Sequence, residues 1–168
     1  MPRSKSGPSD FTLNIIVSQS EGVLPSLTEF WALKENDRYG LEGNDRNYSL
    51  TLYPGVNRSR TTIRTKIDSD PKLQRALNIT SELMQMWQFY RNLRPTLPSP
   101  KELYDKITEL GYDWDMILSK TRRWWTIENT KHELHFLSTM DLVHMYHGKY
   151  HPYWLMDDKK TIKPEFQL

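Results

Sequence analysis

The chain of 168 residues contains no cysteine. Disulfide bonds, thiolate nucleophiles and zinc sites built on cysteine are therefore excluded. No apolar run is long enough to span a bilayer, and residues 1–10 are polar, without the apolar core of a secretory signal. We therefore expect an intracellular protein of the cytoplasm or nucleus, with peripheral attachment to a membrane as an open alternative.

The familiar signatures of catalysis and cofactor binding are also missing. The sequence has no G-x-S-x-G, no P-loop and no dinucleotide fingerprint. Glycines do cluster at 40–45, but the acids Glu42 and Asp45 beside them would repel a phosphate. The sequence therefore predicts no cofactor, and it predicts a protein that works by binding.

Positive and negative charges nearly balance over the whole chain. The net charge is +2, apolar residues make up 37% of the chain and charged residues 26%, as in an ordinary globular domain. A chain of this length buries roughly 70% of the surface that its unfolded form exposes. We expect a single α+β domain over 11–155, preceded by a flexible basic arm at 1–10 and followed by a polar tail at 156–168.

The N-terminal part, about 11–67, is expected to form an antiparallel β-sheet that packs on a C-terminal set of helices. Phe11–Val17 alternates like a half-buried strand, and 29–45 reads as an acidic loop. The clearest hairpin has one strand at Tyr48–Tyr53, a turn at Pro54–Asn57 and a returning strand at Arg58–Ile67.

Helix signals dominate the rest of the chain. Asp70 and Pro71 are a typical N-cap and first helical residue, and Ser99 and Ser138 each begin a capping box. Helices are thus predicted from 71 to before Pro95, from 100 to Gly111, over 113–122 and from 139 to Gly148. The apolar stripe of the first helix comprises Leu73, Ala76, Leu77, Leu83, Met84, Trp87 and Tyr90. Residues 124–137 fit either a second hairpin or a continuous helix.

Two basic surfaces are candidates for binding an anion. On the returning strand of the hairpin, alternate side chains share one face, and no acid occurs between Pro54 and Ile67. The basic residues expected on that strand are Arg58, Arg60, Arg64 and Lys66. The alternative without a binding function is a solvated outer face of the sheet, where cations discourage edge-to-edge aggregation.

The second basic surface mixes cations with tryptophan. It consists of Lys120, Arg122, Arg123 and Trp124. Single-stranded nucleic acid needs such a mixture, cations for its backbone and flat rings for its bases, and an anionic membrane surface suits it too. The alternative is that these cations line a helix end and complement its dipole.

Histidines and aromatics gather near the C-terminus. The five histidines are His132, His135, His144, His147 and His151. Their spacing does not match H-E-x-x-H, so we predict no metal site. The aromatic residues Tyr146, Tyr150, Tyr153 and Trp154 resemble an exposed tail suited to self-association or docking.

These observations predict a non-catalytic structural or assembly protein that binds RNA, a nucleoprotein or an acidic membrane surface. Viral matrix proteins and accessory subunits of ribonucleoprotein machines have a comparable size and layout. A small histidine-dependent metal hydrolase or nuclease-like enzyme is the first alternative, and a protein-interaction domain is the second.

Overall fold

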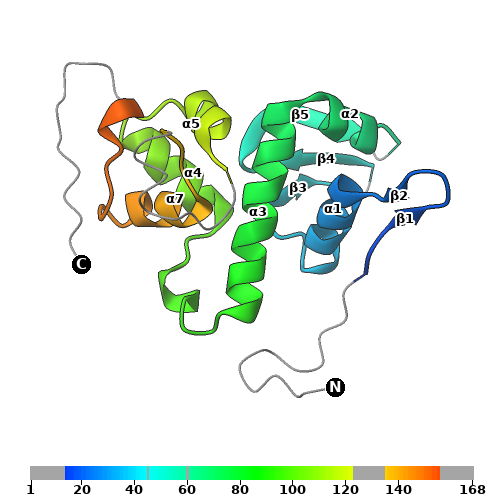
Figure 1. Ribbon diagram of the computed structural model, residues 1–168, viewed down its shortest axis with the longest axis horizontal. Coiled ribbons are helices and arrows are strands. Elements are labelled where there is room, and N and C mark those ends of the chain that lie inside the picture. Colours follow the sequence, from blue (N-terminus) through cyan, green and yellow to red (C-terminus); the bar gives the residue numbers. More distant parts are fainter. Residues whose placement is uncertain (1–13, 45, 60, 123–134, 156–168) are drawn as a thin grey trace.

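The computed structural model describes residues 14–44, 46–59, 61–122 and 135–155. A long helix, α3 (Pro71–Phe89), runs through the middle of the molecule (Figure 1). On one side lie two small β-sheets with helices α1 (Pro25–Glu35) and α2 (Ile63–Ser69). On the other side lie three further described α-helices, α4 (Pro100–Glu109), α5 (Trp114–Lys120) and α7 (Thr139–Tyr146). The predicted α+β class is confirmed.

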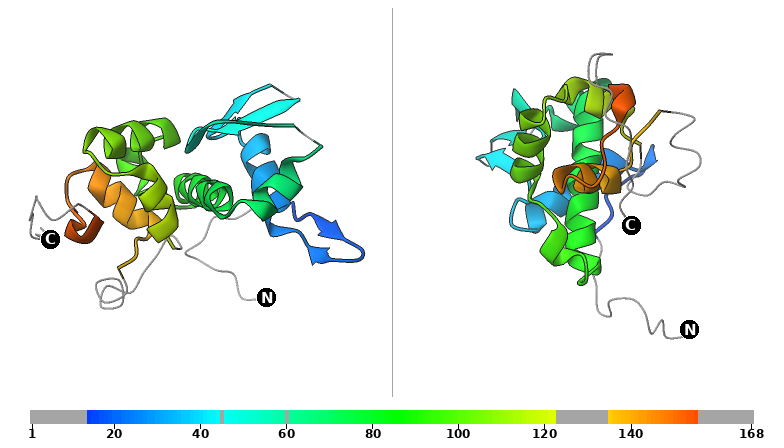
Figure 2. Two further views of the ribbon diagram at one scale, coloured as in Figure 1. Left: turned by 90° about the horizontal axis from the view of Figure 1, so that it is seen from above. Right: turned by 90° about the vertical axis from the view of Figure 1, so that its left-hand side faces the viewer.

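Both sheets are antiparallel and come from the N-terminal part of the chain. The smaller one pairs β1 (Val17–Ser18) with β2 (Gly22–Val23). The larger one has the order β3-β4-β5, and its strands are β3 (Leu41–Gly43), β4 (Asn47–Leu50) and β5 (Tyr53–Ser59). Figure 2 shows this sheet as a layer that lies across α1 and α3.

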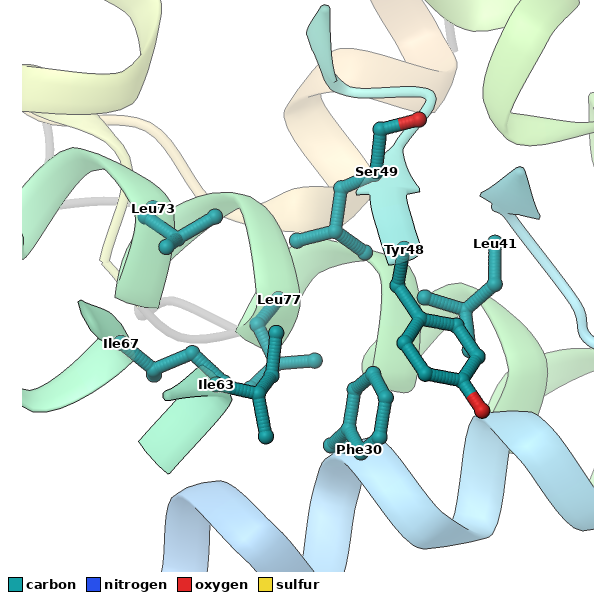
Figure 3. A pocket seen from close by; sticks show the side chains of 9 residues that line it. Phe30, Leu41, Tyr48, Ser49, Ile63, Ile67, Leu73 and Leu77 are labelled. Carbon is teal, nitrogen blue, oxygen red and sulfur yellow. The ribbon is translucent and has the colours of Figure 1, made fainter. Parts of the chain in front are cut away.

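The core fills the space between the larger sheet and the helices. A narrow crevice remains there, and the side chains around it are almost all apolar (Figure 3). Tyr48 and Ser49 are the lining residues that carry a hydroxyl group, and no charged residue lines it. The lining residues are Phe30, Leu41, Tyr48, Ser49, Leu50, Ile63, Ile67, Leu73 and Leu77. The crevice is therefore part of the packed core and offers nothing for acid–base chemistry.

The indole of Trp114 and the backbone at Gly40 contribute to joining the two sides of the molecule. The buried indole Nε1 of Trp114 on α5 donates a hydrogen bond of 2.7 Å to the Leu52 carbonyl oxygen in the turn after β4. Gly40, just before β3, lies directly against Thr80 of α3 and Pro100 of α4. The sheet is thus fixed to both α3 and the helices beyond it.

The predicted helix starts are confirmed. The Asp70 carboxylate accepts hydrogen bonds from the backbone N–H groups of Lys72 and Leu73. Ser99 and Ser138 both form complete capping boxes. After α4 the chain turns at Gly111, whose φ of +86° is one that glycine adopts without strain.

The hairpin exists, but its predicted boundaries are wrong. β4 pairs with β5 through a tight turn at Thr51 and Leu52, not through Pro54–Asn57. Pro54 is tolerated inside β5 because that strand is at the edge of the sheet. β5 ends at Ser59, and the expected strand residues Ile63–Ile67 lie in α2 instead. Ile63 and Ile67 are four residues apart, so one helix face buries both as readily as one strand face would.

The acidic loop predicted at 29–45 is also wrong, because most of its first half belongs to α1. Phe30 and Leu33 are buried there, and Glu35 at the end of the helix is exposed. Of the strand predicted at Phe11–Val17, only Val17 is in β1, and 11–13 lie outside the described residues.

Several predictions concern segments that are not described. They are the basic arm at 1–10, the polar tail at 156–168 and the segment 123–134, which includes most of the predicted second hairpin. Thr121 and Leu137, on either side of 123–134, form an isolated parallel bridge. No described helix has both the length and the apolar character needed to cross a membrane.

Candidate anion-binding surface

The basic strand face does not form as predicted. Arg58 lies on β5 opposite Tyr48, while Arg64 and Lys66 are on α2, where residues two apart point in nearly opposite directions. Arg64 forms ion pairs with Glu21 and, at 3.6 Å, with Asp68. Arg60 lies outside the described residues. The helical conformation of α2 thus separates cations that a strand would have aligned.

Half of the second basic surface is described. Lys120 is the half-buried last residue of α5, and Arg122 is exposed. The Nη1 atom of Arg122 donates to the carbonyl oxygens of Ser119 and Thr121 at 2.8 and 2.9 Å, which caps the C-terminal end of α5. Arg123 and Trp124 lie outside the described residues. Arg122 therefore lines the end of a helix, which is the alternative role stated for these cations in the sequence analysis.

Three of the four aromatic residues predicted as an exposed tail, Tyr146, Tyr150 and Trp154, are buried or half-buried, so the prediction is wrong for them. Tyr150 is only 3% exposed, and Tyr146 and Trp154 pack partly buried against the core. The Trp154 ring stacks on His135 with their centroids 5.3 Å apart. Tyr153 begins the short 3₁₀ helix η2 (Tyr153–Leu155). The chain ends its described part by folding back, because large aromatic side chains gain more by burial than by exposure.

The described histidines do not assemble a metal site. Within the described ranges, no three histidine, aspartate or glutamate side chains are grouped so that they could hold an ion. His147 instead donates from Nε2 to the Thr96 carbonyl oxygen at 2.6 Å. His144 is on α7, His151 follows it, and His132 lies outside the described residues.

A different cationic surface lies at the C-terminal end of α3. This end of the helix extends past α1 and α7 in Figure 1, and its last turn is only partly covered, with Met86 buried and Trp87 exposed. Trp87 and Tyr90 are each 47% exposed, although their spacing had placed them in the buried stripe. Arg91 and Arg94 follow directly and are also exposed. We call these four residues, Trp87, Tyr90, Arg91 and Arg94, the aromatic–arginine surface.

Arg94 is held in place over the tryptophan ring. Its guanidinium carbon is 4.7 Å from the centroid of Trp87, a cation–π geometry. Its Nε donates to the Trp87 carbonyl oxygen, and its Nη2 donates to the Gln88 carbonyl oxygen at 3.2 Å. These two bonds use two of the five guanidinium N–H groups and satisfy carbonyls at the negative end of the helix dipole. Arg94 and Trp87 therefore present a charge and a ring in a fixed arrangement.

The part of the sequence that carries the aromatic–arginine surface contains no acidic residue. Between Leu83 and Lys101 the sequence has neither aspartate nor glutamate. The connection to α4 begins with the 3₁₀ helix η1 (Arg94–Thr96), and the contact from His147 to Thr96 fixes it to the end of α7. This acid-free stretch was visible in the sequence, but the helical spacing of Trp87 and Tyr90 assigned both residues to the core.

Partly buried carboxyl groups lie elsewhere, where α3 meets α1 and α7. Asn78 Nδ2 donates to Glu29 at 2.6 Å, and the Thr139 hydroxyl donates to Glu82. Burial raises the pKa of both glutamates above the ordinary 4.5, although the charge of Arg75 opposes the rise. Burial also lowers the pKa of Arg75. These polar groups tie three helices together and make the stability of the fold depend on pH.

The chain matches no protein-family model, and no curated protein or solved structure is significantly similar to it. Its function is therefore inferred from its own residues.

Proposed function

We propose that this chain is a non-catalytic, intracellular assembly protein that binds single-stranded RNA, free or within a ribonucleoprotein, through the aromatic–arginine surface. The observation that carries the proposal is the fixed pair of Trp87 and Arg94, next to the exposed Tyr90 and Arg91. Aromatic faces stack on bases and arginines pair with phosphates, and single-stranded nucleic acid offers both within one nucleotide.

RNA fits this surface better than a membrane does. Adsorption to an anionic bilayer depends on a cluster of several cations near the surface, and each adds only about 1 kcal/mol. Here two arginines accompany two rings, a ratio suited to stacking rather than to adsorption. The absence of acids between Leu83 and Lys101 leaves nothing in that stretch to repel a phosphate.

The first test is fluorescence anisotropy of a labelled single-stranded RNA titrated with the full chain at about 50 and 200 mM salt. If Arg91 and Arg94 each neutralise one phosphate, affinity should fall about sevenfold between the two salt concentrations. Arg91→Gln should weaken binding and reduce this loss to about 2.5-fold, because one phosphate contact remains. Lys66→Gln removes an exposed cation on α2 and is the matched control, expected to leave both values unchanged.

Stacking is tested separately. Tyr90→Ala should weaken binding about 5- to 150-fold, because a stacked base contributes about 1–3 kcal/mol. Met116→Ala on α5 truncates a side chain of similar exposure, 43%, and should have no effect.

Three outcomes would refute the proposal. Absence of binding at low salt rejects RNA as the partner, and binding to anionic vesicles alone replaces it with a membrane. Binding that Lys66→Gln weakens and that Arg91→Gln and Tyr90→Ala leave intact moves the contact to α2.

A further inference from the structure

The β1–β2 hairpin and the residues just before it expose large apolar side chains. Ile15, Val17 and Val23 are 59%, 63% and 57% exposed, more than any other large apolar side chain there. Val17 and Val23 are cross-strand partners, so their side chains share one face of the ribbon. Ile15 is two residues before Val17 and points to the same side. The three side chains form a continuous apolar face.

The outer edge of β1 also offers backbone hydrogen bonds. The backbone N–H of Leu24 donates to the Ile16 carbonyl oxygen at 2.9 Å, and the N–H of Ile16 donates to Thr28 at 3.1 Å. The backbone N–H and C=O groups of Ile16 are therefore both hydrogen-bonded within the molecule. Because backbone groups alternate in direction along an antiparallel strand, the N–H and C=O groups of Ile15 and Val17 face outward. They are placed to pair with another strand.

The hairpin is held in position and is not a frayed end. Glu21 in its turn forms an ion pair with Arg64 of α2, and Asn14 donates to Glu35 of α1 at 3.0 Å. A two-stranded ribbon of this length is not stable alone in water, so these anchors keep it in place. Figures 1 and 2 both show it projecting from the body beyond α1.

This edge carries no charge or proline that would prevent strand pairing, although β1 itself is short, at two residues. Exposed edges are usually protected by a very short strand, lysine, proline, a bulge or a covering segment. From Phe11 to Ser20 the sequence has no charged residue and no proline. The edge has no cation that could bind an anionic partner. An uncharged, β-branched strand can pair antiparallel with a second copy of itself.

We propose that β1 is a self-association edge, at which a second copy of this chain pairs its own β1 antiparallel about a two-fold axis. The product is a four-stranded ribbon, β2-β1-β1-β2, in which Ile15 and Val17 of both copies contact each other. A two-fold contact is isologous, so the assembly closes as a dimer. The proposal is independent of RNA binding, because it uses neither the end of α3 nor any cation.

Light scattering coupled to size exclusion, with the full chain at about 1 to 100 μM, tests the proposal. The wild-type chain should approach twice the monomer mass. Val17→Lys and Ile15→Lys should each raise the dimer dissociation constant at least about tenfold, because the two-fold axis brings like charges together. Met116→Lys, an equally drastic change on exposed α5, should leave the dimer intact. An unchanged melting temperature shows that each variant folds.

A covalent trap adds a second readout. Because the chain has no cysteine, a single introduced thiol reports on one position only. Under mild oxidation, Val17→Cys or Ile15→Cys should cross-link two copies, and Met116→Cys should not. A monomer at every concentration, or a dimer that neither lysine variant weakens and neither β1 thiol traps, overturns the proposal.

Discussion

Gly40, just before β3, packs directly against α3 and α4, and replacing it with alanine is a direct test of this packing. Its φ is +65°, a conformation that an L side chain adopts at a cost of about 1–2 kcal/mol. A Cβ atom there would lie 2.5 Å from Thr80 Cγ2 and 3.0 Å from Pro100 Cγ.

Neither neighbour of Gly40 can move aside easily. Thr80 is fully buried, and its hydroxyl donates to the Ala76 carbonyl oxygen at 2.7 Å, which fixes its rotamer. Pro100 is a rigid ring at the first position of α4. Overpacking of this kind costs about 1–3 kcal/mol. Together with the backbone term, Gly40→Ala should lower the free energy of unfolding by about 2–5 kcal/mol.

Thermal and urea denaturation of Gly40→Ala and Gly111→Ala separate the backbone cost from the overpacking cost. Gly111 has a φ of +86° and nothing within 4 Å of its added Cβ, so Gly111→Ala should cost only the backbone term, about 1–2 kcal/mol. The corresponding losses in melting temperature are about 4–20 °C for Gly40→Ala and 2–8 °C for Gly111→Ala. Thr80→Ser removes Cγ2 and keeps the hydroxyl, so it should restore much of the loss caused by Gly40→Ala. Equal costs at the two glycines, or no rescue, would refute the assigned contact.

Two further predictions concern buried polar groups. Trp114→Phe removes the indole N–H that donates to the buried Leu52 carbonyl oxygen, so it should cost about 1–3 kcal/mol in urea denaturation; an unchanged midpoint would contradict it. Glu29 and Glu82 have pKa values raised above 4.5 by burial, so the folded state holds their protons to higher pH than the unfolded state does. Their contribution to stability is therefore fully present below pH 4.5 and is lost as the pH rises through the folded-state pKa values. Glu82→Gln should flatten this decline in a series of melts across pH, and an unaltered slope would show that Glu82 does not titrate in this way.

Features determined by a few neighbouring residues could be predicted from the sequence. The caps at Asp70, Ser99 and Ser138 depend on side chains that bond to backbone two or three residues away, so no knowledge of the rest of the fold was needed. The turn at Gly111 is of the same kind.

Features determined by distant packing could not be predicted. Ile63 and Ile67 satisfy both a strand pattern and a helix pattern, so their spacing does not decide between the two, and in the structure α2 buries both side chains. The candidate site failed for a related reason. Trp87 and Tyr90 continue the apolar period of α3, but whether they are buried depends on how far the neighbouring helices reach along it.

The bridge at the end of α5 ties together two parts of the chain that are far apart in the sequence. The N–H of Arg122 donates to the Leu137 carbonyl oxygen at 2.7 Å, and the N–H of Leu137 donates to the Lys120 carbonyl oxygen at 3.0 Å. Leu137 is fully buried and directly precedes Ser138, the N-cap of α7. The two bonds therefore fix the start of α7 beside the end of α5.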